Sequence, residues 1–347
     1  MDFTPLDTLP LDSILIKIDF FSFTANNATY AALGDSYKYW NFYPTRDAAS
    51  FGSIPVWGYG TVIQSNTNIK QGEHIFGYFP PSRFVVFNPI KINPDNFIVS
   101  RPDLPQDRLV YNTYIRTNHS YSFKSLVGYE DVISVFWPLF ATGYYLADMI
   151  TCKNFKVDKI IVTSASSKTA MSFAYSFKLF GNKQPLIALT SHQNLDFVKS
   201  LKLYDQVFSY NQVKEISGSC IITDFAGNQD LNTSLEKHLG KNRHHTISVG
   251  MSHFNPNSKL VGFDKEIDSN KRSEIFFAPS FVQQRYRELG KDVAKKREDD
   301  DWIRVVPVAK HWIKMEKVFG VEGALDVVRL VIDGKGDPKV GYVLSML

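Results

Sequence analysis

The feature that most constrains the fold is an alternation of short apolar strands and helical segments between residues 159 and 249. Strand candidates lie at 160–163, 186–190, 206–209, 220–224 and 246–249, and helix candidates at 169–180, 195–201 and 231–239. The strands are apolar over most of their length, as expected where helices cover both faces of a parallel sheet. This order predicts a doubly wound α/β domain, in which the loops after the strands gather along one edge of the sheet.

The preceding region has a different pattern. Residues 14–125 contain short segments rich in β-branched and aromatic residues, divided by Gly, Pro and Asn, with strand candidates at 14–23, 55–64, 72–80 and 83–90. Short strands with frequent turns predict a barrel or sandwich rather than a wound sheet. Residues 130–150 then have the pattern of a helix with large apolar residues on more than one face.

The region beyond residue 275 is mixed. Segments 281–290 and 304–320 have a helical period, and 321–335 predicts an amphipathic helix that ends at Gly334, a natural C-cap position. The charged run 295–301 changes sign within itself, and we interpret it as a solvated loop or a helix end.

Length and composition exclude several classes of protein. A chain of 347 residues is expected to form two domains, and its 44% hydrophobic content can fill a sizeable core. The net charge of +4, without a dense basic stripe, argues against nucleic acid as the main ligand. No apolar run approaches the length of a membrane span, and early aspartates argue against a secretory signal. With only Cys152 and Cys220, the sequence predicts a reducing, cytoplasmic compartment.

The turn at 164–170 lies where a dinucleotide-binding domain carries its glycine fingerprint, yet it contains no glycine. A helix beginning there would offer free N–H groups to a phosphate, together with nearby hydroxyl groups and the charge of Lys168. The hydroxyl-bearing residues are Ser164, Ser166, Ser167 and Thr169. Alternatively, these serines only cap the helix. The residues of the turn leave both interpretations open.

The end of the next strand carries information about the cofactor. NAD-binding domains place an acidic residue there to bind the ribose hydroxyls, whereas this chain has Ser191 and His192 and no acid until Asp196. A pocket without that carboxylate does not repel a 2′-phosphate, and Ser191 and His192 can donate hydrogen bonds to one. This favours NADP over NAD. The alternative is that these residues form an ordinary polar loop.

The order of these segments resembles that of the medium-chain dehydrogenase/reductases, in their zinc-independent quinone oxidoreductase-like branch, and more closely a poorly characterised subgroup of it. Residues 14–34 are similar to the opening strand and active-site loop of that family. Residues 55–80 are similar to its Pro-x-x-Gly and Gly-Asp-x-Val segments, with Glu73 in place of the aspartate. The segments 137–150, 220–227 and 245–250 are similar to elements of its nucleotide domain. The order and spacing carry the resemblance more than any single motif.

The resemblance implies a GroES-like β-barrel domain plus a Rossmann doubly wound parallel-sheet domain. The boundaries expected from it are 1–130 for the GroES-like domain, 131–272 for the Rossmann NADP-binding domain, and 273–347 for a C-terminal return to the GroES-like domain. It also implies NADPH-dependent hydride transfer to a quinone, an enone or a similar activated double bond, and a possible homodimer. A catalytically silent NADPH-binding protein, of a crystallin or sensor kind, is the alternative.

The resemblance assigns roles to particular residues. Tyr30 matches a tyrosine near the nicotinamide, and Asn26 or Asn27 stands close to the place of the family's active-site asparagine. The residues matched to the cofactor-binding segments are Ser166, Ser167, Lys168 and Thr169 in the pyrophosphate loop, Tyr210 near the ribose-phosphate, and Gly250 and Met251 near the nicotinamide.

Aromatic residues supply candidates for a substrate cleft. The stretch 37–43 contains Tyr39 and Trp40 and would suit a flat, apolar acceptor, although it would equally pack over the barrel end as an aromatic cluster. Phe277 and Arg285 lie where the chain is expected to return to the barrel domain and are further candidates.

No metal site is predicted. The zinc-dependent branch has a cysteine in the active-site loop and a Gly-His-Glu segment. At the corresponding places this chain has Thr-Ala-Asn, at 24–26, and Trp-Gly-Tyr, at 57–59. His244, His245 and His253 lie near one another in sequence but lack carboxylate or cysteine ligands at suitable spacing.

Overall fold

The computed structural model describes residues 8–104, 108–250 and 272–347. The chain forms two compact units that alternate along the sequence. The first unit comprises Met1–Val135, Asp299–Val331 and Val340–Leu347, and the second comprises Phe136–Glu298 and Ile332–Lys339. Two long helices, α4 (Glu130–Lys153) and α9 (Lys291–Ala309), contain boundaries between these units.

The second unit is built on a parallel sheet. Its strands in the described residues are β8 (Lys159–Val162), β9 (Leu186–Thr190), β10 (Gln206–Ser209), β11 (Cys220–Asp224), β12 (Arg243–Ser248) and β13 (Ser273–Ile275). They follow the spatial order β10-β9-β8-β11-β12-β13, and each neighbouring pair is parallel. In chain order this is 3-2-1-4-5-6, the order of Rossmann domains. In such sheets ligands bind beyond the carboxyl ends of the strands where the order reverses, here between β8 and β11.

The helices of the second unit follow its strands as the sequence predicts. They are α5 (Lys168–Leu179), α6 (Leu195–Ser200), α7 (Gln229–Leu239) and α8 (Ala278–Leu289), with short 3₁₀ helices η3 (His192–Asn194), η4 (Tyr210–Glu215) and η5 (Gly240–Asn242). Every residue of β9 and β11 is buried, which explains their continuous apolar sequence. Helix α4 approaches α5 closely at Gly143, where a Cβ atom would lie 2.5 Å from the main-chain nitrogen of Phe173.

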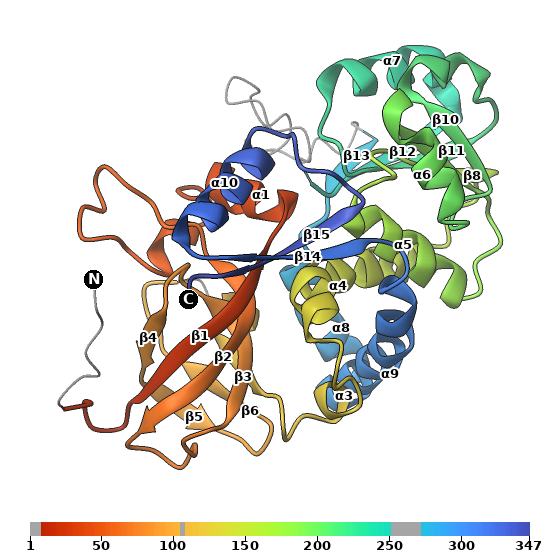
Figure 1. Ribbon diagram of the computed structural model, residues 1–347. Helices are drawn as coiled ribbons and strands as arrows, with labels where there is room; N and C mark the ends of the chain where they lie inside the picture. Colours follow the sequence, from red (N-terminus) through yellow and green to blue (C-terminus); the bar gives the residue numbers. More distant parts are fainter. Residues whose placement is uncertain (1–7, 105–107, 251–271) are drawn as a thin grey trace. The chain divides into compact units, whose positions relative to one another are not determined.

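The first unit contains a mostly antiparallel sheet. Its strands in the described residues are β1 (Ile14–Phe23), β2 (Val56–Ser65), β3 (His74–Phe79), β4 (Phe84–Phe87), β5 (Pro89–Ile92), β6 (Asn96–Val99), β7 (Thr113–Arg116), β14 (Lys314–Phe319) and β15 (Val340–Ser345). The order is β14-β15-β1-β2-β3-β7-β6-β5, and β4 also pairs with β1. In Figure 1 the blue C-terminal strands lie beside the red first strand, so the two ends of the described sequence share one sheet.

Helical segments connect these strands. They are α1 (Ala25–Ala32), η1 (Tyr39–Asn41), α2 (Leu109–Asn112), α3 (Tyr121–Lys124) and α10 (Val321–Ile332). Helix α1 occupies the segment predicted to be an active-site loop. It begins with a capping box in which the Asn27 side chain accepts a hydrogen bond from the Thr24 N–H at 2.8 Å.

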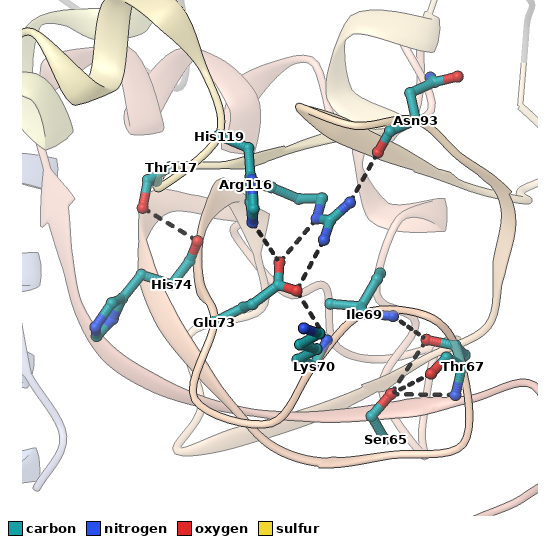
Figure 2. A network of polar contacts seen from close by, with 10 residues as sticks. All are labelled: Ser65, Thr67, Ile69, Lys70, Glu73, His74, Asn93, Arg116, Thr117 and His119. Carbon is teal, nitrogen blue, oxygen red and sulfur yellow. Dashed lines mark hydrogen bonds and ion pairs between the residues drawn. The ribbon is translucent and has the colours of Figure 1, made fainter.

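A network around Glu73 holds the turn that precedes β3. Figure 2 shows the Glu73 carboxylate accepting two hydrogen bonds from the Arg116 guanidinium at 2.8 Å and one from the Lys70 main-chain N–H at 2.8 Å. Arg116 also donates to the Asn93 carbonyl at 3.0 Å, and His119 lies 3.7 Å from the carboxylate. Burial raises the pKa of Glu73, but the Arg116 and Lys70 hydrogen bonds together hold it below its ordinary value of 4.5.

Two expectations for the C-terminal region are wrong. The segment 304–320 is not helical throughout, because α9 ends at Ala309 and residues from Lys314 form strand β14, which pairs with β15. The helical period of residues 314–319 is weak, so their pairing with β15 determines that they form a strand. The charged run 295–301 lies inside α9 rather than in a loop or at a helix end. Glu298 is buried there and accepts a hydrogen bond from the Tyr145 hydroxyl at 3.2 Å.

Two smaller differences concern element boundaries. The single strand expected at 83–90 divides into β4 and β5 at Asn88. The helix predicted at 321–335 ends at Ile332, and Gly334 adopts the left-handed conformation that a C-cap glycine favours, with φ +70°.

Candidate functional site

The turn between β8 and α5 has a left-handed residue although it has no glycine. Ser164 adopts φ +47° and is buried. Its carbonyl accepts a hydrogen bond from the Ser167 N–H at 2.8 Å, which closes the turn. The next residue, Ala165, is held on both sides: its N–H donates to the Leu189 carbonyl at 3.1 Å, and its carbonyl accepts from the Tyr204 hydroxyl at 2.9 Å. Ser164 therefore takes the conformation that a fingerprint glycine would supply.

Ser167 caps helix α5. Its hydroxyl accepts a hydrogen bond from the Ala170 N–H at 3.3 Å. One of the two interpretations of the serines, that they cap the helix, is therefore confirmed for Ser167. The cap does not use every donor of the turn: within the described ranges, no acceptor lies in hydrogen-bond range of the main-chain N–H groups of Ser166, Lys168 or Thr169. These three groups stand at the positive end of α5, where anions bind.

The loop after β9 meets this turn. The Ser166 hydroxyl oxygen lies 3.4 Å from the Thr190 hydroxyl and accepts a hydrogen bond from the Asn194 side chain at 3.3 Å. Ser191 is the N-cap residue of η3, and its buried hydroxyl has no hydrogen-bond partner in the part of the chain that the structure describes. His192 is exposed. The structure thus brings the predicted pyrophosphate turn and the predicted 2′-phosphate loop together.

Lys168 is held by a segment far away in the sequence. Its ammonium group donates a hydrogen bond to the Pro338 carbonyl at 3.2 Å. Desolvation lowers the pKa of Lys168 to about 8, while the neighbouring carboxylate of Asp337 acts in the opposite direction. Pro338 lies in 332–339, the short stretch that belongs to the second unit. Lys168, the residue predicted to bind the phosphate, is therefore hydrogen-bonded to a main-chain carbonyl.

The carboxyl end of β11 is organised by a buried carboxylate that the sequence analysis did not single out. Asp224 accepts hydrogen bonds from the Thr163 hydroxyl at 2.6 Å, from the Ala226 N–H at 3.0 Å and from the Asn232 side chain at 2.7 Å. The signal was available, because a Thr and an Asp end two strands that are expected to neighbour each other. The Asp224 carbonyl accepts from the Gly250 N–H at 3.4 Å, which fixes the start of the loop after β12. Met251, predicted beside Gly250, lies outside the described residues.

Tyr210 is also adjacent to the turn. Its phenol hydrogen-bonds to Ser164, and burial raises its pKa to about 12. The second unit therefore gathers Ser166, Lys168, Thr169, Ser191 and Tyr210 around the start of α5.

The predicted catalytic residues lie in the first unit and are largely buried. Tyr30 is 4% exposed, and its hydroxyl accepts a hydrogen bond from the Trp57 indole at 3.1 Å. The Asn27 side chain accepts from Thr24 and donates to the Pro55 carbonyl at 3.0 Å, so both ends of its amide are used. Asn26 is only partly buried and hydrogen-bonds to Tyr30. Of the three residues, Asn26 retains the most access to solvent.

The predicted cleft residues pack within their own units. The Tyr39 ring is buried, and its centroid lies 4.8 Å from that of the Tyr30 ring. The Tyr39 hydroxyl oxygen lies 3.1 Å from that of Tyr111. Trp40 covers Gly34 and Gly52, where a side chain at either glycine would overlap the ring. This arrangement matches the alternative of an aromatic cluster within the barrel domain.

Phe277 lines a cavity of about 650 Å³ in the second unit, together with Met149, Phe276, Phe281 and Arg285. Arg285 is paired there with Asp148 at 2.6 Å. A second cation of the lining, Lys153, is paired with Glu274 at 2.6 Å.

The described residues hold neither a metal-binding cluster nor a membrane-spanning helix. They contain no group of three His, Cys, Asp or Glu side chains placed to hold a metal ion. They also contain no helix with the length and hydropathy needed to cross a membrane.

The sequence matches, over residues 21–337, the family described as "Protein of unknown function (DUF2855)". The chain belongs to the DUF2855 family. No curated protein matches the sequence.

Solved structures similar to this DUF2855 chain include CurA of Vibrio vulnificus in complex with NADPH, with a TM-score of 0.62 and 14% identity over 99% of this chain and 93% of that chain. The Escherichia coli quinone oxidoreductase complexed with NADPH has a TM-score of 0.55 and 14% identity, over 99% and 94%. The yhdH oxidoreductase of Salmonella enterica in complex with NADP has a TM-score of 0.51 and 12% identity, over 100% and 95%. These likenesses confirm the predicted fold class, a GroES-like barrel domain plus a Rossmann domain.

Proposed function

We propose that the protein is an NADPH-dependent oxidoreductase that transfers hydride to a quinone, an enone or a similar activated double bond without zinc. The observation that carries the proposal is the set of three N–H groups, those of Ser166, Lys168 and Thr169, at the start of α5 beside the point where the strand order reverses. A pyrophosphate is the ligand that such a helix start suits best. The similar structures named above were solved with NADPH or NADP.

The residues after β9 support a phosphorylated ribose. The buried Ser191 hydroxyl lacks a partner in the described structure, and a buried hydroxyl without one is costly unless a ligand satisfies it. Exposed His192 follows directly, and no carboxylate stands at either position. These donors fit a 2′-phosphate, so we propose NADPH rather than NADH as the cofactor.

NADPH would supply the hydride, which leaves the chain the tasks of binding, orienting and excluding water. The turn at 164–170 would bind the pyrophosphate, and Tyr210 and Gly250 would lie near the cofactor. On the acceptor side, Asn26 is the predicted residue that remains partly exposed, and an amide of this kind can donate to a developing oxyanion.

A catalytically silent NADPH-binding protein is the second candidate, and a specific observation favours it. The polar groups of Tyr30 and Asn27 are committed to hydrogen bonds within the first unit. Turnover of a panel of quinones and enones with NADPH separates the two candidates, because the silent protein would bind NADPH without oxidising it in the presence of any acceptor.

The test of the cofactor is a titration with NADPH and, separately, with NADH, followed by nicotinamide fluorescence. We expect tighter binding of NADPH. Replacing Ser191→Asp should weaken NADPH binding by about tenfold or more, because a carboxylate repels a nearby phosphate, and should change NADH binding much less. Ser200→Asp, at an exposed position at the end of α6, is the matched control. Absence of binding of either cofactor to the wild-type protein would refute the proposal.

The homodimer and the cytoplasmic location expected from the sequence stay predictions. Size-exclusion chromatography with light scattering tests the first, and localisation of a tagged chain tests the second.

A further inference from the structure

We propose that the second unit favours NADP⁺ over NADPH through the charge of Asp224, a buried carboxylate at the end of β11. The inference rests on the proposed function, since it concerns the same edge of the parallel sheet. It adds to that function a preference between the two redox forms of the cofactor, and it assigns this preference to one side chain.

Three carboxylates are buried in the part of the chain that the structure describes, and their surroundings differ. The Glu73 carboxylate lies 2.8 Å from the Arg116 guanidinium, and that of Glu298 lies 3.7 Å from the Lys295 ammonium group. Asp224 is 2% exposed, and its carboxylate contacts only neutral groups of the described residues. A buried charge without a cation beside it is costly, and functional sites are where such groups gather.

The contacts of Asp224 indicate that its side chain is ionised. The carboxylate accepts hydrogen bonds from the N–H groups of Ala226 and Gly227, at 3.0 and 3.2 Å, and from the Asn232 amide at 2.7 Å. The Thr163 hydroxyl donates at 2.6 Å, and its own oxygen accepts from two N–H groups of the loop after β11. A protonated acid would need an acceptor for its proton, whereas all four of these partners donate.

The carboxylate lies at the edge of the sheet where we propose that the cofactor binds. Asp224 ends β11, beside the point where the strand order reverses, and its partner Thr163 directly precedes the glycine-free turn. The Asp224 main-chain carbonyl accepts from the N–H groups of Val249 at 2.9 Å and Gly250 at 3.4 Å. The side chain is thus tied to the predicted pyrophosphate turn, and the main chain to the predicted nicotinamide loop.

A negative charge at this place acts differently on the two forms of the cofactor. The nicotinamide of NADP⁺ carries a positive charge that NADPH lacks, whereas the phosphate groups are the same in both. The Asp224 charge therefore opposes the phosphates of both forms equally and attracts only the oxidised nicotinamide. In a partly buried site, one such interaction changes a binding equilibrium by about tenfold. The same charge favours hydride transfer to the acceptor, because it stabilises the charge left when the hydride departs with its electron pair.

The experiment compares the dissociation constants of NADPH and NADP⁺ in one buffer. NADPH is followed by nicotinamide fluorescence, and NADP⁺ by its displacement of bound NADPH. Asp224→Asn removes the charge but keeps the shape, and the Asn232 amide can turn its oxygen toward the new NH₂ group. We expect the ratio of the NADPH constant to the NADP⁺ constant to fall about tenfold. Asn232→Lys places a cation beside the carboxylate and should also lower this ratio.

Two controls separate the charge of Asp224 from its structural contacts. Thr163→Val removes a hydrogen bond of the carboxylate but leaves its charge, so it should weaken both cofactor forms alike and leave the ratio unchanged. Asp205→Asn removes a carboxylate at the opposite edge of the same sheet, where it accepts at 2.8 Å from the N–H of Leu186, the first residue of β9. This variant should also leave the ratio unchanged.

The outcomes distinguish the inference from the proposed function. An unchanged ratio in Asp224→Asn would overturn the inference alone, because the carboxylate would then only hold the loops in place. If thermal unfolding shows that this variant does not fold, the ratio in Asn232→Lys decides. Wild-type protein that binds NADPH but not NADP⁺ would also overturn the inference alone. Wild-type protein that binds neither form would refute the proposed function together with the inference.

Discussion

Two turns of the molecule enter the left-handed region of backbone conformation and are held there in different ways. The turn before β3 uses a glycine, Gly72, with φ +86° and no atom within 4 Å of where its Cβ would lie. The turn before α5 uses Ser164, a residue that has a Cβ and hydrogen-bonds to the partly buried Tyr210. The first turn has side-chain hydrogen bonds at its flank, whereas in the second the left-handed residue itself hydrogen-bonds to a side chain. Backbone geometry alone therefore does not tell which residue a turn depends on.

The largest effect is expected at the flank of the first turn. Replacing Arg116→Ala leaves the buried Glu73 carboxylate without its two charged hydrogen bonds and should lower the free energy of unfolding by about 2–4 kcal/mol. Urea denaturation measures this change. Arg329→Ala removes an exposed partner of Asp326 and is the matched control, with an expected change below about 0.5 kcal/mol. Equal losses in both variants would mean that the Glu73 network does not anchor the turn.

A smaller effect is expected at Gly72 itself. Gly72→Ala introduces a Cβ into open space, so only the backbone conformation opposes it, and the free energy of unfolding should fall by about 1 kcal/mol. Gln71→Ala, at the exposed neighbouring position, controls for the loss of a surface residue. A Gly72→Ala variant as stable as wild type would show that this turn relaxes freely, which removes the contrast with Ser164.

The smallest effect concerns pH and the second turn. The pKa of Lys168 is lowered to about 8 from its ordinary value of 10.5. Between these values the unfolded chain keeps a proton that the folded protein has released, so the free energy of unfolding should rise with pH in this window. Relative to Lys168→Met, wild type should gain less than about 1 kcal/mol between pH 8 and pH 10, because part of the side chain is solvated. A flat difference across this window in urea denaturation would contradict the prediction.

Local sequence patterns predicted much of the second unit. Continuous apolar runs bounded by polar turns located β8, β9, β10 and β11 to within about one residue, since burial on both faces leaves a pattern that the strand carries in its own sequence. The same reasoning placed Ser191 and the start of α5 at one edge of the sheet. Strand β14 was mistaken for helix because its residues are half-exposed at a sheet edge, where neither period is clear.

The side-chain contacts of the site could not be predicted in this way. The bond between Lys168 and Pro338 joins residues 170 positions apart, and the contact between Tyr210 and Ser164 likewise depends on tertiary packing. Nor does any local pattern show that the polar groups of Tyr30 and Asn27 would form hydrogen bonds within the barrel domain. Such contacts depend on how elements distant in sequence pack, and no window of neighbouring residues contains that information.

The pairing of β1 with β15 has a consequence for synthesis of the chain. The Ser345 hydroxyl donates to the Asp19 carbonyl across a separation of 326 residues, and the register pairs Phe21 with Leu344. Strand β1 must therefore wait until a segment about 326 residues further along the chain has been synthesised before its partner β15 emerges. Contacts of such long range are slow to form, and an unpaired strand edge exposed in the meantime favours association with other chains. Translation as far as β15, rather than local folding, sets the moment at which β1 can pair with it.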